Sequence, residues 1–329
     1  MRARYLTMAA FMACGLTGGT AAAQTVMEII TFKGNLALPY FFAQEKGLFA
    51  KEGLTVNVTW TPSSGYQFQN LVNGKFQVAQ TAIDNQIAYM EGQGTAKLDR
   101  EPDLITILGG SSIELTLMAQ PSIKSYADLK GKDLALDSIS TGFAFVLRRM
   151  LEKNGIGFSD VKFVPFGGTD KRWEALKEGK AAASLMNEPF RTIAMNAGYT
   201  RLGEGLDVIG RYLASVHVVD RAWARDNEKT AVGYIRAYIG ATQWVYDRAN
   251  HPEAVKIAMA RLEVPEPVAA SRIKGLVEGR TALEPRGVVD MEGLKNVIEL
   301  REQYGQPQKK LGAPEKYLDL SYYKKAMGG

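Results

Sequence analysis

Small polar residues are concentrated in one short loop of the sequence, residues 138–142. The loop follows an apolar, strand-like run and ends where a helical pattern starts at Phe143. Unpaired backbone N–H groups give a helix N-terminus a partial positive charge, which suits an anion or a strong hydrogen-bond acceptor. Helix capping by Ser140 or Thr141 is the alternative role. The predicted ligand contacts in this loop are Ser138, Ser140, Thr141, Gly142 and Phe143.

Four other segments, GNLAL, TPSSGYQ, AIDN and MNEP, have similar composition and also lie between strand-like and helical runs. Pro39 after the first of them suits the first position of a helix. The carboxylates of the last two could bind an amine or hydroxyl of a ligand, or neutralise an arginine. A plain strand-to-helix turn is the alternative for the first loop. The predicted contacts are Asn35, Ser63, Ser64, Gly65, Tyr66, Asp84, Asn85, Asn187 and Glu188.

An internal repeat indicates which elements position these loops. Strand, polar loop, helix, strand, helix, Gly-Lys and strand follow one another twice, 105 positions apart, so that Ile30 matches Ala135 and Asn35 matches Ser140. In open parallel sheets, ligands bind beyond the carboxyl ends of the strands, where such loops lie. The repeat therefore predicts two similar α/β lobes, each with parallel strands and covering helices, and a ligand between them.

The remaining segments connect and complete the lobes. Extended residues 112–120 and 213–219 are the predicted crossovers between lobes, and His217 in the second of them is a further predicted ligand contact. Pro and Gly separate the four helices predicted near the C-terminus. These helices span residues 227–250, 252–262, 267–278 and 291–304.

The N-terminus predicts export. Arg2 and Arg4 precede a short apolar segment, and Ala21 and Ala23 fit a small-x-small cleavage site before Gln24, so residues 1–23 are predicted to be a secretory signal. The apolar part is shorter than the roughly 20 residues of a membrane span. The predicted location of the mature chain is the periplasm.

The only cysteine, Cys14, lies within the predicted signal. The mature chain therefore has no disulfide, no thiol nucleophile and no cysteine-ligated metal. FMAC before Gly15 resembles a lipoprotein acceptor site, so lipid anchoring is a minor alternative to cleavage after Ala23.

Composition and motifs exclude several classes of function. The 329 residues are 46% hydrophobic and 23% charged, which permits a large core in one or two domains. Without Arg2 and Arg4 the 40 Lys and Arg fall to 38, against 35 Asp and Glu, which disfavours nucleic-acid binding. The chain has no G-x-S-x-G, H-E-x-x-H or Walker A motif and only two histidines, far apart, so no catalytic residue, metal or cofactor is predicted.

Several runs together resemble the nitrate/sulfonate/taurine-type periplasmic solute-binding proteins of ABC importers. They are AQEKGLFAKEGLTVNV, ADLKGKDLAL, SISTG, VKFVPFGGTDKRWEALKEGKAAASLMNEPF and YLDLSYYKKA, and the resemblance extends from about Glu28 to Ala326. It implies a type II two-lobe fold, a mainly parallel sheet in each lobe and hinge closure around one solute. The implied lobes are residues 24–113 with 218–329, and residues 114–217. Carried over to this chain, the family's ligand loops also include Leu36 and Ala37.

The resemblance implies a monomer that captures a small anionic organic solute, such as a sulfonate, an aromatic carboxylate or a pyrimidine, and delivers it to a membrane ABC permease. Sulfonate-binding members often have a tryptophan where this chain has Asn187, which puts a sulfonate in doubt. Aromatic residues near the loops could stack on a ring. A sensory receptor is one alternative function. An enzyme resembling the thiamine-pyrimidine synthases of the same fold is another, and the absence of cysteine from the mature chain disfavours it.

Overall fold

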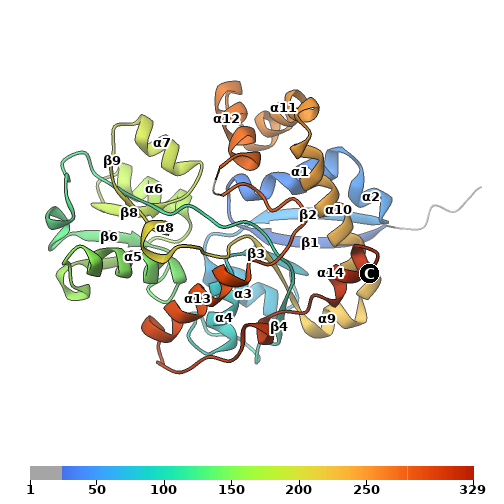
Figure 1. Ribbon diagram of the computed structural model, residues 1–329, viewed down its shortest axis with the longest axis horizontal. Coiled ribbons are helices and arrows are strands. Elements are labelled where there is room, and N and C mark those ends of the chain that lie inside the picture. The colour runs from blue at the N-terminus through green and yellow to red at the C-terminus, as the bar shows by residue number, and fades with distance from the viewer. Residues whose placement is uncertain (1–23, 280) are drawn as a thin grey trace, which may run out of the picture.

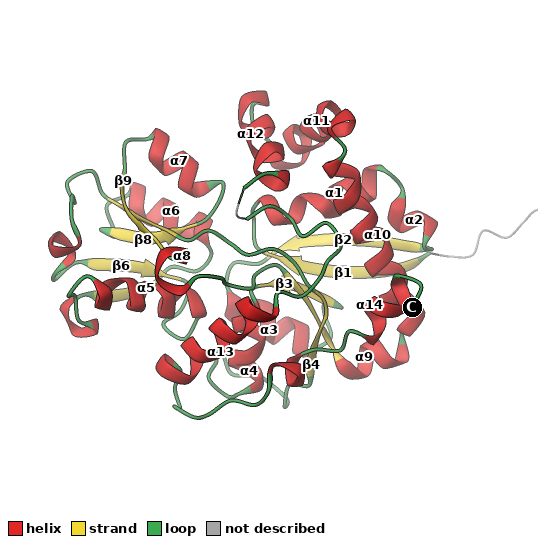
Figure 2. Cartoon of the chain, in the orientation of Figure 1, coloured by secondary structure: helices red, strands yellow, loops and turns green. Residues whose placement is uncertain are grey.

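A computed structural model describes residues 24–279 and 281–329, and it consists of two five-stranded sheets with helices packed around them (Figures 1 and 2). The predicted secretory signal and the lipid-anchoring site at Cys14 lie outside the described residues. None of the helices in the described residues combines the length and the apolar character that a membrane span requires.

The first sheet, which defines lobe I, has the strand order β2-β1-β3-β10-β4. β1 pairs in parallel with β2 and β3, whereas β10 runs antiparallel between β3 and β4. The strands are β1 (Thr25–Thr31), β2 (Leu54–Trp60), β3 (Val78–Thr81), β4 (Leu104–Leu108) and β10 (Val216–Asp220). The predicted lobe boundary between residues 217 and 218 thus falls inside β10, and the whole strand belongs to lobe I.

The second sheet, which defines lobe II, has the equivalent order β7-β6-β8-β5-β9. β6 pairs in parallel with β7 and β8, and β5 is the antiparallel strand between β8 and β9. The strands are β5 (Thr116–Ala119), β6 (Asp133–Leu136), β7 (Lys162–Pro165), β8 (Ala183–Met186) and β9 (Thr200–Glu204).

The strand register reproduces the sequence repeat. Ile30 on β1 faces Ala79 on β3, and 105 positions later Ala135 on β6 faces Ser184 on β8. The same offset relates the β1–β2 pairs to the β6–β7 pairs. The predicted two-lobe α/β fold is therefore confirmed, and the two lobes are built on one plan.

The helices flank both sheets, and the four predicted near the C-terminus are present within a few residues of their predicted bounds. The helices of lobe I are α1 (Leu38–Glu45), α2 (Leu48–Lys51), α3 (Ser64–Val72), α4 (Ile83–Met90), α9 (Arg221–Asp226), α10 (Glu228–Tyr246), α11 (His251–Leu262), α12 (Glu266–Val277), α13 (Met291–Tyr304) and α14 (Ser321–Ala326). In lobe II they are α5 (Gly142–Lys153), α6 (Thr169–Lys177), α7 (Phe190–Asn196) and α8 (Leu206–Ile209). Helix α13 contacts both α4 and α5 and so joins the lobes.

The crossovers are shorter than predicted, because residues 116–119 and 216–219 enter the sheets as parts of β5 and β10. The connecting segments lie side by side, as the Ser112–Leu213 bridge and the hydrogen bond from the Ala214 N–H to the Ser111 carbonyl show. Gly110 lies so close to Ser215 that a Cβ at Gly110 would be 2.2 Å from the Ser215 carbonyl oxygen. The two connections therefore pack tightly against each other.

Glu91, which follows α4, joins lobe I to the C-terminal segment. Its carboxylate accepts from Lys309 at 2.8 Å, Lys316 at 2.5 Å and the Tyr317 hydroxyl at 2.9 Å. Burial alone would raise the pKa of Glu91, but these hydrogen bonds outweigh it and lower the pKa from 4.5 to about 2. The ionised carboxylate therefore stabilises the fold above about pH 4.5, and this contribution is lost as the pH falls toward 2.

Replacing Glu91 with glutamine is expected to remove this pH-dependent stabilisation. The variant should be less stable than the wild type at pH 6, and the difference should shrink steadily between pH 4.5 and 2. Urea unfolding at several pH values measures it, and added salt should reduce it because both lysines are partly exposed. A difference that does not change with pH would show that the ion pairs do not stabilise the fold.

Candidate functional site

A partly open cavity of about 90 Å³ lies between the lobes, at the carboxyl ends of the parallel strands. Thr31 ends β1, Thr81 ends β3, Asp137 follows β6 and Asn187 follows β8, and all four line the cavity. The repeat thus brings equivalent strand ends from both lobes to one place. The other lining residues are Phe32, Lys33, Gly34, Asn35, Leu36, Gln80, Ala82, Asp84, Asn85, Ile113, Thr141, Phe143, Gly168, Thr169, Arg172, Ala214 and Ser215.

Arg172 on α6 is the most deeply buried cation of this wall, with 2% of its surface exposed. Its Nη1 donates to the Leu185 carbonyl at 2.8 Å, and its Nη2 donates to the Thr169 hydroxyl at 2.6 Å. Its Nε has no partner, and the guanidinium forms no ion pair with a carboxylate among the described residues. Burial lowers the pKa of Arg172 to about 10, which still leaves it charged at neutral pH. A buried, unpaired guanidinium is suited to bind an anion.

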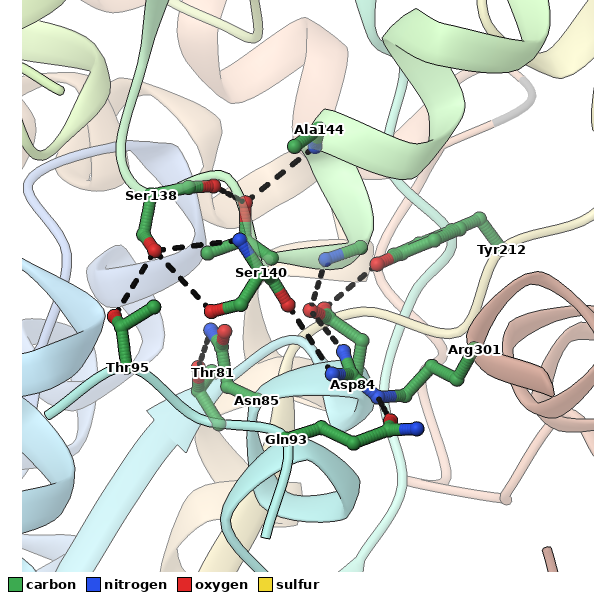
Figure 3. A network of polar contacts seen from close by, with 12 residues as sticks. Thr81, Asp84, Asn85, Gln93, Thr95, Ser138, Ser140, Ala144, Tyr212 and Arg301 are labelled. Carbon is green, nitrogen blue, oxygen red and sulfur yellow. Dashed lines mark hydrogen bonds and ion pairs between the residues drawn. The ribbon is translucent and has the colours of Figure 1, made fainter. Parts of the chain in front are cut away.

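Asp84 at the start of α4 connects the lobes beside the cavity (Figure 3). Its carboxylate accepts from the Gly142 N–H of lobe II at 2.5 Å and from the Tyr212 hydroxyl at 2.6 Å, and Arg301 of α13 lies 3.7 Å away. Burial raises the pKa of Asp84, although Arg301 and both hydrogen bonds oppose the shift. Burial also lowers the pKa of Arg301, which donates to Gln93 and to the Ser140 carbonyl. Asp84 thus holds the two lobes in contact.

The polar loop at residues 138–143 contributes only part of its predicted contacts to the cavity. Thr141 and Phe143 line it, and Thr141 also caps α5 by accepting from the Ala144 N–H. The Ser138 hydroxyl instead contacts Thr95 at 3.0 Å and Ser140 at 3.2 Å (Figure 3). Ser138, Ser140 and Gly142 are not among the residues that line the cavity. Their polar groups are used to shape the loop and to join the lobes.

In lobe I, too, only some of the predicted contact residues line the cavity. Asn35 and Leu36 line the cavity, and the Asn35 Oδ1 atom is buried without a partner, whereas Ala37 lies in the core. In the TPSSGYQ loop, Ser63 caps α3 and the Ser64 N–H donates to Asp137 Oδ2 at 3.1 Å. No residue from Ser63 to Tyr66 lines the cavity: Gly65 approaches Ala96, and Tyr66 is exposed beside Lys75.

The amide and carboxylate residues that follow β3 and β8 lie at two different depths between the lobes. Asn85 and Asn187 line the cavity, and they bond to Thr81 and Thr169 respectively. Glu188 lines a second hollow of about 670 Å³, between α7 and α12, and it pairs with Arg191. Asn35, Leu36, Ile113 and Asn187 line both the cavity and this outer hollow, so the two adjoin.

His217 lies away from the predicted contact surface, in a buried aromatic cluster. Its Nδ1 is 2.6 Å from the Tyr234 hydroxyl and 3.2 Å from the Tyr40 hydroxyl, and its ring packs against Tyr238. It lines neither the cavity nor the outer hollow. Burial lowers the pKa of His217 to about 3, so the ring is neutral and serves the packing of β10.

Arg172 and Gln80 line the cavity but were not among the contacts predicted from the sequence. The repeat contains a signal for the first, because Arg172 corresponds to Gln67 at the offset of 105. Gln67 donates to the Gln80 carbonyl, and Arg172 donates to the carbonyl of Leu185, which is the equivalent residue of lobe II. Both side chains therefore reach from a helix to the end of the equivalent strand, which is β3 in lobe I and β8 in lobe II. In lobe II that position carries a charge, and it lines the cavity.

A comparison of the sequence with models of protein families identifies a match over most of the chain. Residues 21–259 match the model of the NMT1-like family. No curated protein sequence matches the chain significantly. Among the described residues, no group of three or more His, Cys, Asp or Glu could hold a metal ion.

Solved structures with a similar fold have low sequence identity to the chain. The periplasmic nitrate-binding protein NrtA from Synechocystis PCC 6803 has a TM-score of 0.77 at 16% identity, over 93% of this chain and 89% of that one. The periplasmic aliphatic sulphonate-binding protein SsuA from Escherichia coli has a TM-score of 0.66 at 20% identity, over 89% and 92%. A DszB mutant in complex with biphenyl-2-sulfinic acid has a TM-score of 0.63 at 14% identity, over 93% and 99%.

Proposed function

The chain belongs to the NMT1-like family, and from this membership and the site we propose that it is a periplasmic receptor for a small anionic organic solute. The solute binds in the cavity between the lobes and is delivered to a membrane ABC permease. The proposed receptor acts as a monomer, because the two lobes of one chain form the whole cavity, and solute binding itself requires no cofactor.

The observation that carries this proposal is the unpaired guanidinium of Arg172. Asp137 and Asp170 act on this buried guanidinium electrostatically, but neither forms an ion pair with it, so an anionic group of the ligand would add the direct charged partner that it lacks. The exposed ammonium of Lys33, at the same cavity, adds positive charge that attracts an anion. Thr141 and Asn187 supply neutral polar groups, and Phe143 offers an apolar face for the rest of the solute.

The two-lobe arrangement explains how binding is transmitted. A ligand that contacts both lobes binds the closed arrangement more tightly than an open one. The difference between these two binding free energies is the amount by which the ligand stabilises the closed arrangement. The lobes move about the paired connections at Gly110 and Ser215. Closure then changes the relative position of the two outer lobe surfaces, which is the signal that a permease reads. The fold similarity to periplasmic nitrate- and sulphonate-binding proteins supports this function.

An enzyme is the second candidate, because the DszB mutant has a similar fold and was solved with an organic acid bound. Covalent catalysis by a thiol is disfavoured in this chain, since its one cysteine lies in the predicted signal. Turnover of a bound solute, followed by mass spectrometry, distinguishes the two: a receptor releases the solute unchanged.

Replacing Arg172 with glutamine is expected to weaken anion binding by about ten- to a hundredfold, which is the cost of losing a charge-assisted hydrogen bond from the Nε atom that has no partner in the protein. Thermal shift with nitrate, ethanesulfonate and benzoate, each at millimolar concentration, identifies the anions that stabilise the wild type, and calorimetry measures their dissociation constants. Neutral benzamide should have no effect.

Arg201→Gln is the matched control, because Arg201 is exposed, pairs with Glu204 and does not line the cavity. Its anion affinity should equal that of the wild type. The proposal is wrong if an anion stabilises the Arg172→Gln variant as much as the wild type, since Arg172 would then not bind it.

A further inference from the structure

Arg272 on α12 is a buried cation to which the proposed function assigns no role. Only 9% of its surface is exposed, and its Nε atom is buried without a hydrogen-bond partner. None of its nitrogen atoms forms a hydrogen bond or an ion pair with another described residue. Buried polar groups are nearly always hydrogen-bonded, and a guanidinium has five N–H donors, so this exception requires an explanation.

Glu188 of lobe II has a carboxylate oxygen without a partner, and it lines the same outer hollow as Arg272. Its Oε1 accepts from Arg191 Nε at 2.6 Å and from the Thr192 hydroxyl at 2.8 Å, whereas no described residue donates to its Oε2. Burial lowers the pKa of Arg272, and the charge of Glu188 opposes this shift, so the two charges interact although they form no ion pair. An unused donor and an unused acceptor of opposite charge thus belong to the two lobes that form one hollow.

The lobes are in contact on one side of the solute cavity and apart on the other. On the contact side, hydrogen bonds join lobe I to residues 137–142 of lobe II, and Figure 3 shows the one between Thr95 and Ser138. On the side of the outer hollow, described residues 187–196 form no hydrogen bond or ion pair with lobe I, and the partners of Glu188 all belong to lobe II. Since the cavity adjoins the outer hollow, this side is a route between the cavity and solvent.

We propose that α12 and α7 close the outer hollow through an ion pair between Arg272 and Glu188, and that this pair retains the bound solute. The inference rests on the proposed function, because it assigns a role to a second part of the same receptor. Formation of the pair gives the Arg272 guanidinium and Glu188 Oε2 the partners that both lack. Arg272 does not line the cavity, so it is a positioning residue that controls release without contacting the solute.

Helix α12 is also connected to the cavity within lobe I. It packs against the turn Asn35–Ala37, and two residues of this turn, Asn35 and Leu36, line both the cavity and the outer hollow. A solute that contacts Asn35 therefore holds in place the turn on which α12 rests. Solute binding and formation of the ion pair are thus expected to favour each other.

The distance between α7 and α12 tests the ion pair without any solute. Residues 24–329 contain no cysteine, so Met195→Cys on α7 and Val268→Cys on α12, both at exposed positions, can be spin-labelled specifically. Pulsed electron paramagnetic resonance is expected to show a population at short distance. In Arg272→Gln and in Glu188→Gln this population should fall at least about threefold, because the ion pair is lost. Arg272→Lys keeps the charge and should retain most of it.

Lys274→Gln is the matched control for the loss of one positive charge from α12. Lys274 also lines the outer hollow, but it is exposed and its nearest carboxylate, 3.9 Å away, is Glu278 of the same lobe. This variant should give the distance distribution of the wild type. Circular dichroism and the melting temperature verify that each variant is folded. The ion pair is excluded if Arg272→Gln has the same distance distribution as the wild type.

The rate of solute release tests the second part of the proposal. The probe is whichever of nitrate, ethanesulfonate and benzoate stabilises the wild type, and stopped-flow tryptophan fluorescence follows its dissociation. Arg272→Gln should release the anion about three- to tenfold faster than the wild type, as the loss of one partly exposed ion pair implies. The association rate should change by less than about twofold, because the anion enters while the hollow is open. The anion should also increase the short-distance population of the wild type.

The outcomes separate this inference from the proposed function. If none of the three anions binds, the anion receptor and the retention of an anion are both excluded, and the distance measurement still shows whether Arg272 and Glu188 pair. If an anion binds and Arg272→Gln releases it at the wild-type rate, the receptor stands and the inference is wrong. A short-distance population that depends on Arg272, together with faster release from Arg272→Gln, supports both.

Discussion

Replacing Asp84 with asparagine is expected to lower the free energy of unfolding by about 3 kcal/mol, because it leaves the buried Arg301 without its negative partner. Arg301 is fully buried, and its Nη1 has no hydrogen bond. Its remaining contacts, to Gln93 and to the Ser140 carbonyl, are neutral acceptors that do not balance its charge. Asparagine has nearly the volume of aspartate, so the loss of stability measures the effect of removing the negative charge. Urea unfolding at pH 7 measures it.

The double variant Asp84→Asn with Arg301→Gln provides the control for this prediction. Because burial raises the pKa of Asp84 and lowers that of Arg301, each charge is retained mainly to compensate the other. The double variant should therefore be more stable than the sum of the two single losses predicts, by at least about 1 kcal/mol. Strictly additive losses would show that the two charges are not coupled, and that Asp84 acts only through Gly142 and Tyr212.

Replacing Gly110 with alanine is expected to cost about 3 kcal/mol, near the upper end of the usual overpacking range. The added Cβ would lie 2.2 Å from the Ser215 carbonyl oxygen and 2.9 Å from its carbonyl carbon, and these backbone atoms cannot rotate away. Ser215 has a φ of 58°, which a non-glycine residue rarely adopts, so it has little freedom to adjust. Urea unfolding measures the loss. Ligand affinity should also fall, because Ser215 lines the cavity.

Gly275→Ala in α12 is the matched control, since nothing lies within 4 Å of the added Cβ. Alanine is favoured over glycine within a helix, so this variant should be more stable than the wild type by about 0.5–1 kcal/mol. If Gly110→Ala unfolds at the same urea concentration as the wild type, the two connections are not in the tight contact described above.

The sequence predicted the fold well because its signals are periodic and repeated. The offset of 105 between Ile30 and Ala135 located equivalent strands, and the structure pairs them with equivalent partners. The lengths of the crossovers were less predictable. Extended residues such as 116–119 look the same in sequence whether they join a sheet or connect two lobes, because the pairing partner lies far away in the chain.

Within the site, strand ends were predictable but side-chain directions were not. Ser138 and Thr141 have similar hydroxyls, yet only Thr141 lines the cavity, because Ser138 finds Thr95 from the other lobe as a partner. Arg172 was missed because it lies one turn into a helix and not in a loop. His217 was predicted to lie at the crossover by its position in the chain, but tyrosines of α1 and α10 surround it.

The position of β10 affects the order in which the protein can fold. All five strands of lobe II lie within residues 116–204, whereas β10, which separates β3 from β4, follows more than 100 residues after β4. Lobe II can thus complete its sheet from a contiguous stretch of chain. Lobe I, although its first strand comes earlier, must wait for residues 216–220 and close a loop that contains the whole of lobe II, which is the slow kind of contact in folding. The lobe that begins the chain is therefore expected to be the last to be completed.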